Sequence, residues 1–205
     1  MNTLLHPTYF ASISHWIAIV NADELTFEVN DTYQKQTYRN RTTIYSANGK
    51  LSLTVPVVFS QKNRQLFRDI KIHNDHKWQA LHWKSLLSAY RTSPFFEFYE
   101  DELAPLFHSK QGYLMDYNFK CFKTLLECMQ LDLEFGKTEA YEKKLENVQD
   151  LRYLTNARKE EAFNFSEYTQ VFSNKHGFIS NLSILDLLFN EGPNALNYLK
   201  AQTIS

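Results

Sequence analysis

Hydrophobic positions in the first half of the chain alternate with polar ones over short stretches. Residues 25–29 follow this pattern and predict a half-buried strand. The strand-like runs 42–47 and 50–55 flank Asn48-Gly49, a pair that tolerates positive φ, so the sequence predicts a β-hairpin there. Hydrophobic residues recur at helical spacing over 13–20, which predicts a short helix before the first of these strands.

In the second half the hydrophobic period is that of helices. One helix should begin near Asp75, with Asn74 or Asp75 as its cap. Its buried face is expected to carry four residues spaced four apart: Trp78, His82, Leu86 and Tyr90. A longer amphipathic helix is expected over 113–133, and the last helix should be broken in two at Gly192-Pro193.

These elements favour an α/β fold formed by a single domain over residues 1–205. A strand, a proline turn, a helix and a second strand resemble the opening of the HIGH-motif nucleotidyltransferases, although His15 alone remains of the expected H-x-G-H. This layout favours a central, largely parallel sheet, with a β-hairpin near 42–55 and a helical C-terminal half. Residues 136–161 are densely charged, so we expect an exposed and mobile loop or surface helix there.

Composition narrows the classes of function. A formal net charge of -1 argues against nucleic acid as the main partner. The apolar run Trp16–Val20 is too short for a membrane span or a secretory leader, so a cytoplasmic protein is expected. Cys121 and Cys128 would lie about 10 Å apart on one helix, too far for a disulfide, and are expected to be free thiols.

The stretch Tyr33–Arg41 is the strongest candidate for a binding site. It combines Lys35, Arg39 and Arg41 with two tyrosines, and it directly follows the strand that ends near Asp31. Arginine and lysine side chains are suited to hold phosphate or carboxylate groups. The alternative is a solvated basic turn, and the residues alone leave both interpretations open.

The histidines offer a proton acceptor but no convincing metal site. His73, His76 and His82 are spaced too irregularly to form a ligand set, and no metal or cofactor is expected. His82 is either a hydrogen-bonded core residue or a general base, and the same alternatives stay open for His15. P-loop, dinucleotide-binding, serine-hydrolase and zinc-protease motifs are absent from the sequence.

Six motifs in fixed order resemble the WbqC-like proteins, and together they span nearly the whole chain. They are His6-Pro7-Thr8-Tyr9-Phe10, Lys35-Gln36-x-Tyr38-Arg39-Asn40-Arg41, Leu53-Thr54-Val55-Pro56-Val57, Trp78-x-x-x-His82, Tyr90-Arg91-x-x-Pro94-Phe95-Phe96 and the segment 181–190. The family usually opens with Gln-Pro-x-Tyr-x-Pro, so here His6 stands in place of Gln and Ala11 in place of the second Pro.

The resemblance implies a role in the synthesis of O-antigen or other surface polysaccharides. It suggests a cytoplasmic transferase that modifies a nucleotide- or lipid-linked amino sugar, for instance by aminoacyl or glycyl transfer. Under this hypothesis His82 or His15 is the base, and the ligand-binding residues are His6, Tyr9, Lys35, Tyr38, Arg39, Asn40 and Arg41. The alternative hypothesis is a non-catalytic binding or scaffold protein, favoured by the aromatic run 95–99 and the charged segment 136–161. The oligomeric state is left open.

The location of the site follows from the expected sheet. In open α/β sheets, ligands bind beyond the carboxyl ends of the strands. The turn after Leu5, the basic stretch after Asp31 and the helix near Asp75 all follow strand-like segments. We therefore expect these three turns to surround one cleft. It should gather His6, Tyr9, His15, Lys35, Arg39, Arg41 and His82. The alternative is a surface network in which Arg39 and Arg41 pair with Asp31, Glu97, Glu100 or Asp101.

Overall fold

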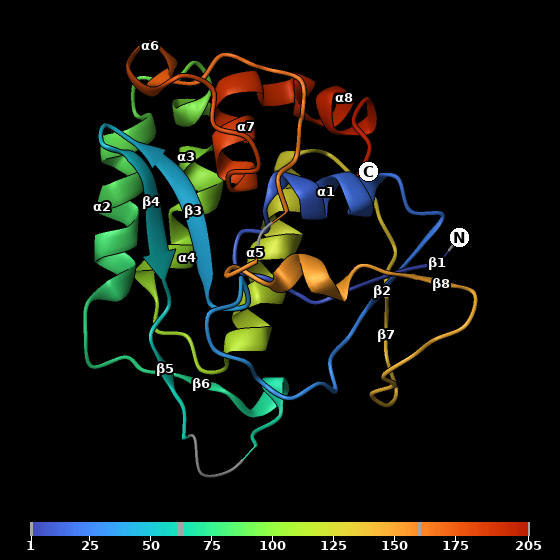
Figure 1. Cartoon of the computed structure of the whole chain (residues 1–205). Coiled ribbons are helices and arrows are strands. Elements are labelled where there is room, and N and C mark those ends of the chain that lie inside the picture. Colours follow the sequence, from blue (N-terminus) through green and yellow to red (C-terminus); the bar gives the residue numbers. More distant parts are fainter. Residues whose placement is uncertain (1, 61–63, 160, 205) are drawn as a thin grey trace.

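A four-stranded parallel sheet forms the centre of the fold (Figure 1). The computed structural model describes residues 2–60, 64–159 and 161–204. The sheet has the order β7-β2-β1-β8. Its strands are β1 (Asn2–Leu5), β2 (Glu24–Phe27), β7 (Gly136–Lys137) and β8 (Val148–Asp150). The expected α/β fold with a largely parallel central sheet is confirmed.

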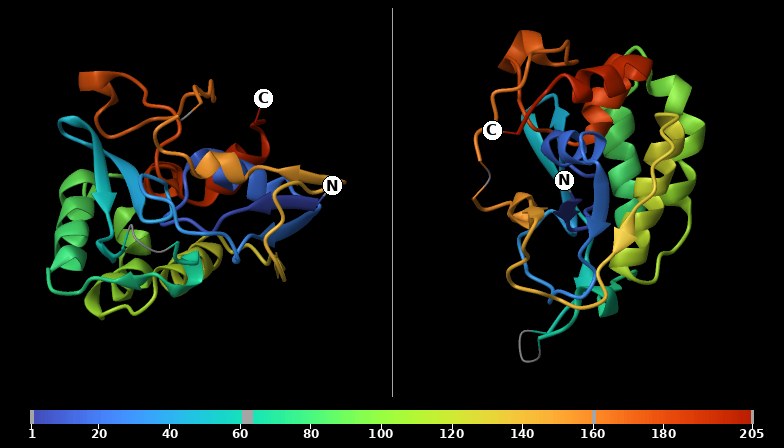
Figure 2. Two further views of the ribbon diagram at one scale, coloured as in Figure 1. Left: turned by 60° about the horizontal axis from the view of Figure 1, so that its bottom comes forward. Right: turned by 90° about the vertical axis from the view of Figure 1, so that its right-hand side faces the viewer.

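Aromatic side chains hold the helices against this sheet. Helix α1 (Ile13–Val20) connects β1 to β2, and α5 (Leu114–Cys128) packs against Phe27 of β2. The rings of Trp16 on α1 and Phe122 on α5 lie 5.3 Å apart between centroids. Figure 2 shows α1 and α5 beside the strands, with the C-terminal helices next to α1.

The predicted hairpin is confirmed as β3 (Arg41–Ser46) and β4 (Gly49–Thr54), which pack against helix α2 (Trp78–Tyr90). Gly49 uses the positive φ that the turn requires, at +92°, whereas Asn48 does not. A smaller antiparallel pair, β5 (Val57–Val58) with β6 (Lys71–Ile72), continues from the hairpin.

Short helices complete the C-terminal half. The α-helices are α3 (Phe96–Leu103), α4 (Pro105–His108), α6 (Ser173–His176), α7 (Ile184–Glu191) and α8 (Ala195–Lys200). The 3₁₀ helices are η1 (Phe67–Asp69), η2 (Arg152–Thr155) and η3 (Gly192–Asn194). The break between α7 and α8 falls at Gly192-Pro193, as the sequence predicts.

Three local expectations differ from the structure. Helix α2 begins at Trp78 without a side-chain cap, because Asn74 instead donates to the carbonyl oxygens of Ile72 and Gln111. Helix α5 ends at Cys128, five residues before the expected end. The charged segment 136–161 is not a plain loop or surface helix, because β7, β8 and η2 are formed within it.

A buried carboxylate ties the C-terminal helices to the hairpin. Asp186 on α7 accepts hydrogen bonds from the Tyr90 hydroxyl at 2.8 Å, the Tyr168 hydroxyl at 2.5 Å and the Gln170 amide at 2.9 Å. Tyr90 in turn accepts from the backbone N–H of Tyr45 on β3. Burial raises the pKa of Asp186. We call these residues the Asp186 cluster.

Both cysteines are free thiols, as expected. Among the described residues, no helix is both long enough and apolar enough to cross a membrane.

Candidate functional site

A polar cleft of about 400 Å³ opens where three of the parallel strands end. His6 directly follows β1, Asp31 follows β2 by four residues, and Arg152 comes two residues after β8. Parallel strands bring these ends to one side of the sheet, where ligands commonly bind. The cations among the described lining residues are Lys35, Arg39, Arg152 and Arg158.

At the base of the cleft, Arg39 is buried against Asp31 and His6. Its Nη2 donates to Oδ2 of Asp31 at 2.5 Å and to Nε2 of His6 at 2.8 Å, while Nη1 donates to the Thr32 carbonyl oxygen at 3.1 Å. Phe67 lies under the guanidinium at 5.2 Å. Arg39 is 2% exposed, so this is a buried ion pair rather than the surface network that the sequence left as an alternative.

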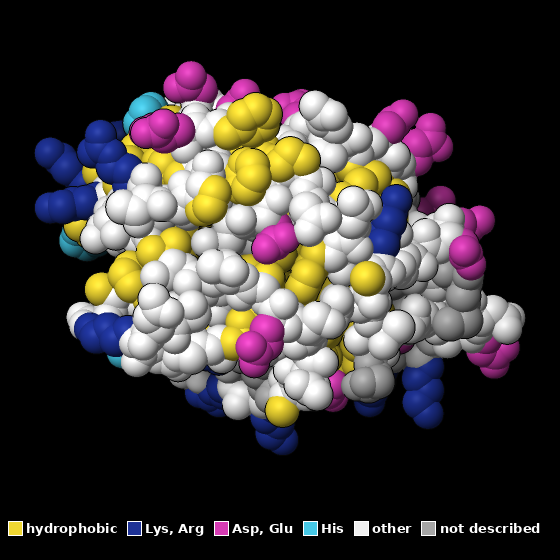
Figure 3. Space-filling view, turned by 90° about the horizontal axis from the view of Figure 1, so that it is seen from above, with side chains coloured by type: hydrophobic (Ala, Val, Ile, Leu, Met, Phe, Trp, Pro, Cys, Tyr) yellow, Lys and Arg dark blue, Asp and Glu magenta, His cyan; other side chains and the backbone are white. Residues whose placement is uncertain are grey.

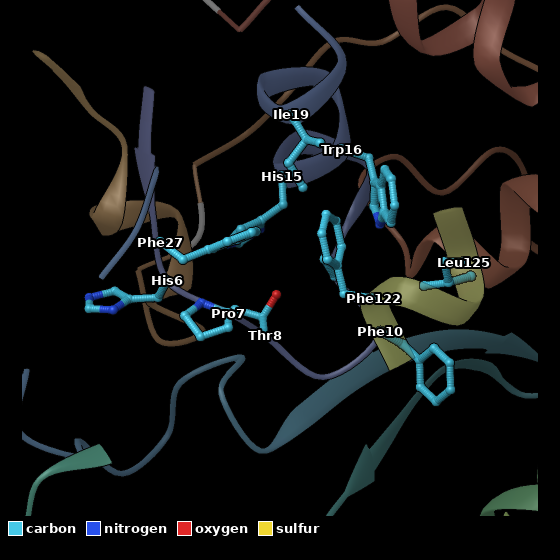
Figure 4. Close-up of a pocket in the computed structure, with 11 residues that line it drawn as sticks. His6, Pro7, Thr8, Phe10, His15, Trp16, Ile19, Phe27, Phe122 and Leu125 are labelled. Atoms are coloured by element: carbon cyan, nitrogen blue, oxygen red, sulfur yellow. The ribbon is translucent and has the colours of Figure 1, made fainter. Parts of the chain in front are cut away.

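His6 must be neutral to take part in this arrangement. An arginine can only donate, so the His6 nitrogen facing Arg39 carries a lone pair. Burial holds the pKa of His6 well below 6.5, and the charges of Arg39 and Arg152 lower it further. His6 also lines a small, mostly apolar cavity of about 10 Å³ behind the cleft, and its imidazole points away from the Trp16 and Phe122 rings there (Figure 4). We call this the rear cavity.

A second buried carboxylate positions the wall formed by η2. Glu28 lies just after β2, is fully buried, and accepts from the Thr138 hydroxyl at 2.8 Å and from Arg152 at 3.3 Å. Arg152 also pairs with Asp150 at 2.6 Å, and its hydrogen bond with Asp150 raises the pKa of Arg152. Arg152 therefore serves mainly to hold the wall.

The rim of the cleft carries cations that are not neutralised. Within the described part of the chain, neither Lys35 nor Arg158 forms an ion pair, and both are exposed. The loop with Lys35 is latched to η2 because the backbone N–H of Tyr38 donates to the Thr155 carbonyl oxygen at 2.8 Å. Gln36, next to Lys35, has a φ of +60°, a strained value for a residue with a side chain.

The structure brings three of the expected site residues, His6, Lys35 and Arg39, into the cleft and places the two expected bases elsewhere. His82 accepts from or donates to the Tyr9 hydroxyl at 2.9 Å and packs on Trp78. His15 contacts the Ser12 hydroxyl at 2.9 Å and lines the rear cavity. Burial lowers the pKa of His82 to about 4 and that of His15 to about 3, so both are neutral at neutral pH.

The remaining expected ligand-binding residues do not line the cleft. Tyr9 is fully buried. Tyr38 is also buried, and its backbone N–H forms the hydrogen bond to Thr155. Asn40 donates to the Val55 carbonyl oxygen at 2.9 Å, and Arg41 begins β3. These residues shape the fold around the cleft from behind.

Several residues of the cleft went unnoticed in the sequence. Tyr141, Arg152, Tyr153 and Arg158 lie in the charged segment, where no hydrophobic period marks a strand. Asn118 of α5 donates to the carbonyl oxygens of Pro7 at 3.2 Å and Arg39 at 2.7 Å, and so fixes the two loops together. The available signal in the sequence was a polar residue at a position of the hydrophobic helix face, and the structure shows that Asn118 is fully buried.

No metal site is apparent. Within residues 2–60, 64–159 and 161–204, no group of three or more His, Cys, Asp or Glu side chains is arranged to hold an ion.

Comparison with known proteins places this parallel-sheet protein in a family. The WbqC-like protein family matches residues 6–164 and 158–198. The chain belongs to this family. It is also 26% identical to the uncharacterized protein Rv1507c of Mycobacterium tuberculosis (strain ATCC 25618 / H37Rv), over 96% of each chain. No solved structure matches the chain significantly.

Proposed function

We propose that the cleft binds an anionic, phosphorylated small molecule. The observation that carries this proposal is the pair of cations, Lys35 and Arg158, at the rim of a polar cleft beside the strand ends; neither forms an ion pair with the residues that the structure describes. Arginine and lysine donate charge-assisted hydrogen bonds to phosphate oxygens. The volume of about 400 Å³ falls in the range of small-molecule sites.

The finer proposal is a transferase that modifies an activated amino sugar, carried through a diphosphate on a nucleotide or a lipid, in surface polysaccharide synthesis. The sugar amine would form a bond to the acyl carbon of an acyl or aminoacyl donor, the bond from that carbon to its carrier would break, and the amine proton would pass to a base. His15 and His82 are the candidates for this base; both are neutral, but their lowered pKa values make them weak proton acceptors, and both lie outside the cleft lining.

The test is the affinity of inorganic pyrophosphate and of a nucleotide amino sugar, measured by calorimetry. Arg39 is a poor target because its loss would leave Asp31 buried and unpaired. We expect the Lys35→Ala/Arg158→Ala protein to bind both ligands about 10²–10⁴-fold more weakly, since each of the two lost charge-assisted bonds is worth about 1.5–3 kcal/mol. Its melting temperature should stay near that of the wild type.

Lys123→Ala/Arg91→Ala is the matched control, because it removes the same two charge types from exposed positions outside the cleft. Equal loss of affinity in both double variants would point to general electrostatics and contradict the proposal.

A non-catalytic partner-binding role is the second candidate. Phe98 and Leu81 are 64% and 63% exposed, and Figure 3 shows hydrophobic side chains gathered over one face of the molecule. In the aromatic run, however, Phe96 and Tyr99 are buried. A scaffold protein should bind neither pyrophosphate nor nucleotide amino sugars in the calorimetric experiment.

A further inference from the structure

Two exposed tyrosines distinguish the rim of the cleft. Tyr141 and Tyr153 line it and are 47% and 46% exposed. The tyrosines that the sequence suggested for stacking, Tyr9 and Tyr38, are buried and unavailable to a ligand. An exposed ring beside unpaired cations is the combination by which proteins hold a base next to its phosphates.

The ring of Tyr141 and the backbone of Tyr153 are both held in place by contacts within the protein. The guanidinium of Arg152 lies 5.3 Å from the centre of the Tyr141 ring and covers one of its faces. Tyr153 lies on η2 between Arg152 and Leu154, whose side chains are largely buried. The backbone N–H of Asn156 donates to the Tyr153 carbonyl oxygen at 2.9 Å. The η2 helix therefore fixes Tyr153 at the rim, which reduces the entropy lost on stacking.

A hydrogen-bonding group lies beside this ring. Asn156 uses its side-chain oxygen to accept from the backbone N–H groups of Arg158 at 3.0 Å and Lys159 at 3.3 Å. This fixes the amide, and its Nδ2 forms no hydrogen bond to the described residues. A fixed donor next to a stacking ring suits the polar edge of a nucleobase.

Among the described residues, the cavities that share lining residues with the cleft, one at His6 and one at Tyr153 and Asn156, are each only about 10 Å³ and too small for a lipid tail. The rear cavity, which adjoins the cleft at His6, has a volume of only about 10 Å³, close to that of one water molecule. A prenyl chain bound through its diphosphate would therefore have to lie along a polar surface.

We propose that the ligand is a nucleoside diphosphate derivative, whose base stacks on Tyr153 while its phosphates bind Lys35 and Arg158. This inference rests on the proposed function and selects the nucleotide over the lipid as carrier of the sugar. Tyr141, which is 47% exposed and lines the same cleft, offers a second ring for the base.

The experiment compares inorganic pyrophosphate, UDP, ADP and farnesyl diphosphate by calorimetry. In the wild type we expect at least one nucleoside diphosphate to bind about tenfold more tightly than pyrophosphate and farnesyl diphosphate. Tyr153→Leu should lose this advantage while pyrophosphate binds as before. Tyr153→Phe should keep it, because stacking needs the ring and not the hydroxyl.

Tyr113→Leu is the control, since Tyr113 is 40% exposed outside the cleft and its replacement should change no affinity. Equal affinities for pyrophosphate and nucleoside diphosphates, or unchanged nucleotide binding by Tyr153→Leu, would overturn this inference and leave the proposed function standing. Tightest binding of farnesyl diphosphate would overturn it in favour of the lipid carrier. Binding of none of the four compounds would overturn both proposals.

Discussion

Two buried carboxylates, Asp31 and Asp186, are surrounded by very different donors. Asp31 lies at the base of the cleft and accepts from a cation, Arg39, which is shared with His6. Asp186 is enclosed among helices and accepts from two tyrosine hydroxyls and an amide, all of them neutral. Burial of an acidic group is therefore not by itself the mark of a site. What distinguishes the cleft is cationic donors next to an opening, with further cations left unpaired at its rim.

Lowering the pH should have the largest effect on the free energy of unfolding, and the effect should have opposite signs for the buried histidines and for Asp186. The pKa values of His6, His15 and His82 are lowered on folding. Below about pH 6.5 the unfolded chain therefore binds more protons than the folded one, and the free energy of unfolding decreases as the pH is lowered. From pH 7 to pH 5 each histidine should cost about 2 kcal/mol. Asp186, whose pKa is raised by burial, acts in the opposite direction, because its folded form binds a proton more readily than its unfolded form.

Urea unfolding at pH 7, 6 and 5 measures this loss. The His6→Gln protein serves as the comparison, because it should lose about a third of the slope. Equal slopes in the two proteins would show that His6 does not titrate as its surroundings imply.

Removing the acceptor of the enclosed cluster should produce the next largest effect. Asp186→Ala leaves the hydroxyls of Tyr90 and Tyr168 and the Gln170 amide buried without their acceptor, at a cost of about 4 kcal/mol in the free energy of unfolding. Pyrophosphate affinity, corrected for the folded fraction, should not change. Asp101→Ala, at an exposed position on α3, should alter stability by less than about 0.5 kcal/mol. A specific loss of ligand affinity in Asp186→Ala would erase the distinction between the two carboxylates.

The smallest expected effect concerns His6 at neutral pH. His6→Gln keeps an acceptor for Arg39, since the amide oxygen can replace the imidazole nitrogen, and should cost less than about 1 kcal/mol. His6→Leu removes this acceptor and should cost about 2 kcal/mol. Thermal and urea unfolding distinguish the variants. If His6→Gln is as unstable as His6→Leu, the imidazole does more than accept a hydrogen bond.

Local sequence patterns predicted the parts of the fold that local forces determine. The hairpin followed from Gly49, helix α1 from its hydrophobic spacing, and the break between α7 and α8 from Pro193. Two of the three segments expected around one cleft, those after β1 and β2, do line it, but the helix near Asp75 does not. The hairpin, helix α1 and the break between α7 and α8 each depend on residues close together in the chain, whereas the cleft joins segments that follow three different strands.

The rest depends on contacts between distant segments. Strands β7 and β8 are only two and three residues long and carry no hydrophobic alternation, because their pairing with β2 and β1 uses backbone groups. The cleft wall formed by η2 was therefore not predicted, and neither were Arg152, Tyr153 and Arg158. His82 was placed correctly on the buried face of α2, but its partner Tyr9 lies 73 residues away in sequence.

The short strands at both edges of the sheet also affect how readily folded molecules associate at high protein concentration. An exposed edge strand offers unpaired N–H and C=O groups on which a second chain can add a strand. Here the borders are β7 and β8, each too short to template a ladder, and Lys137 and Asp150 place charge on them. We expect concentrated solutions of the folded protein to resist the edge-to-edge association through which many sheet proteins aggregate.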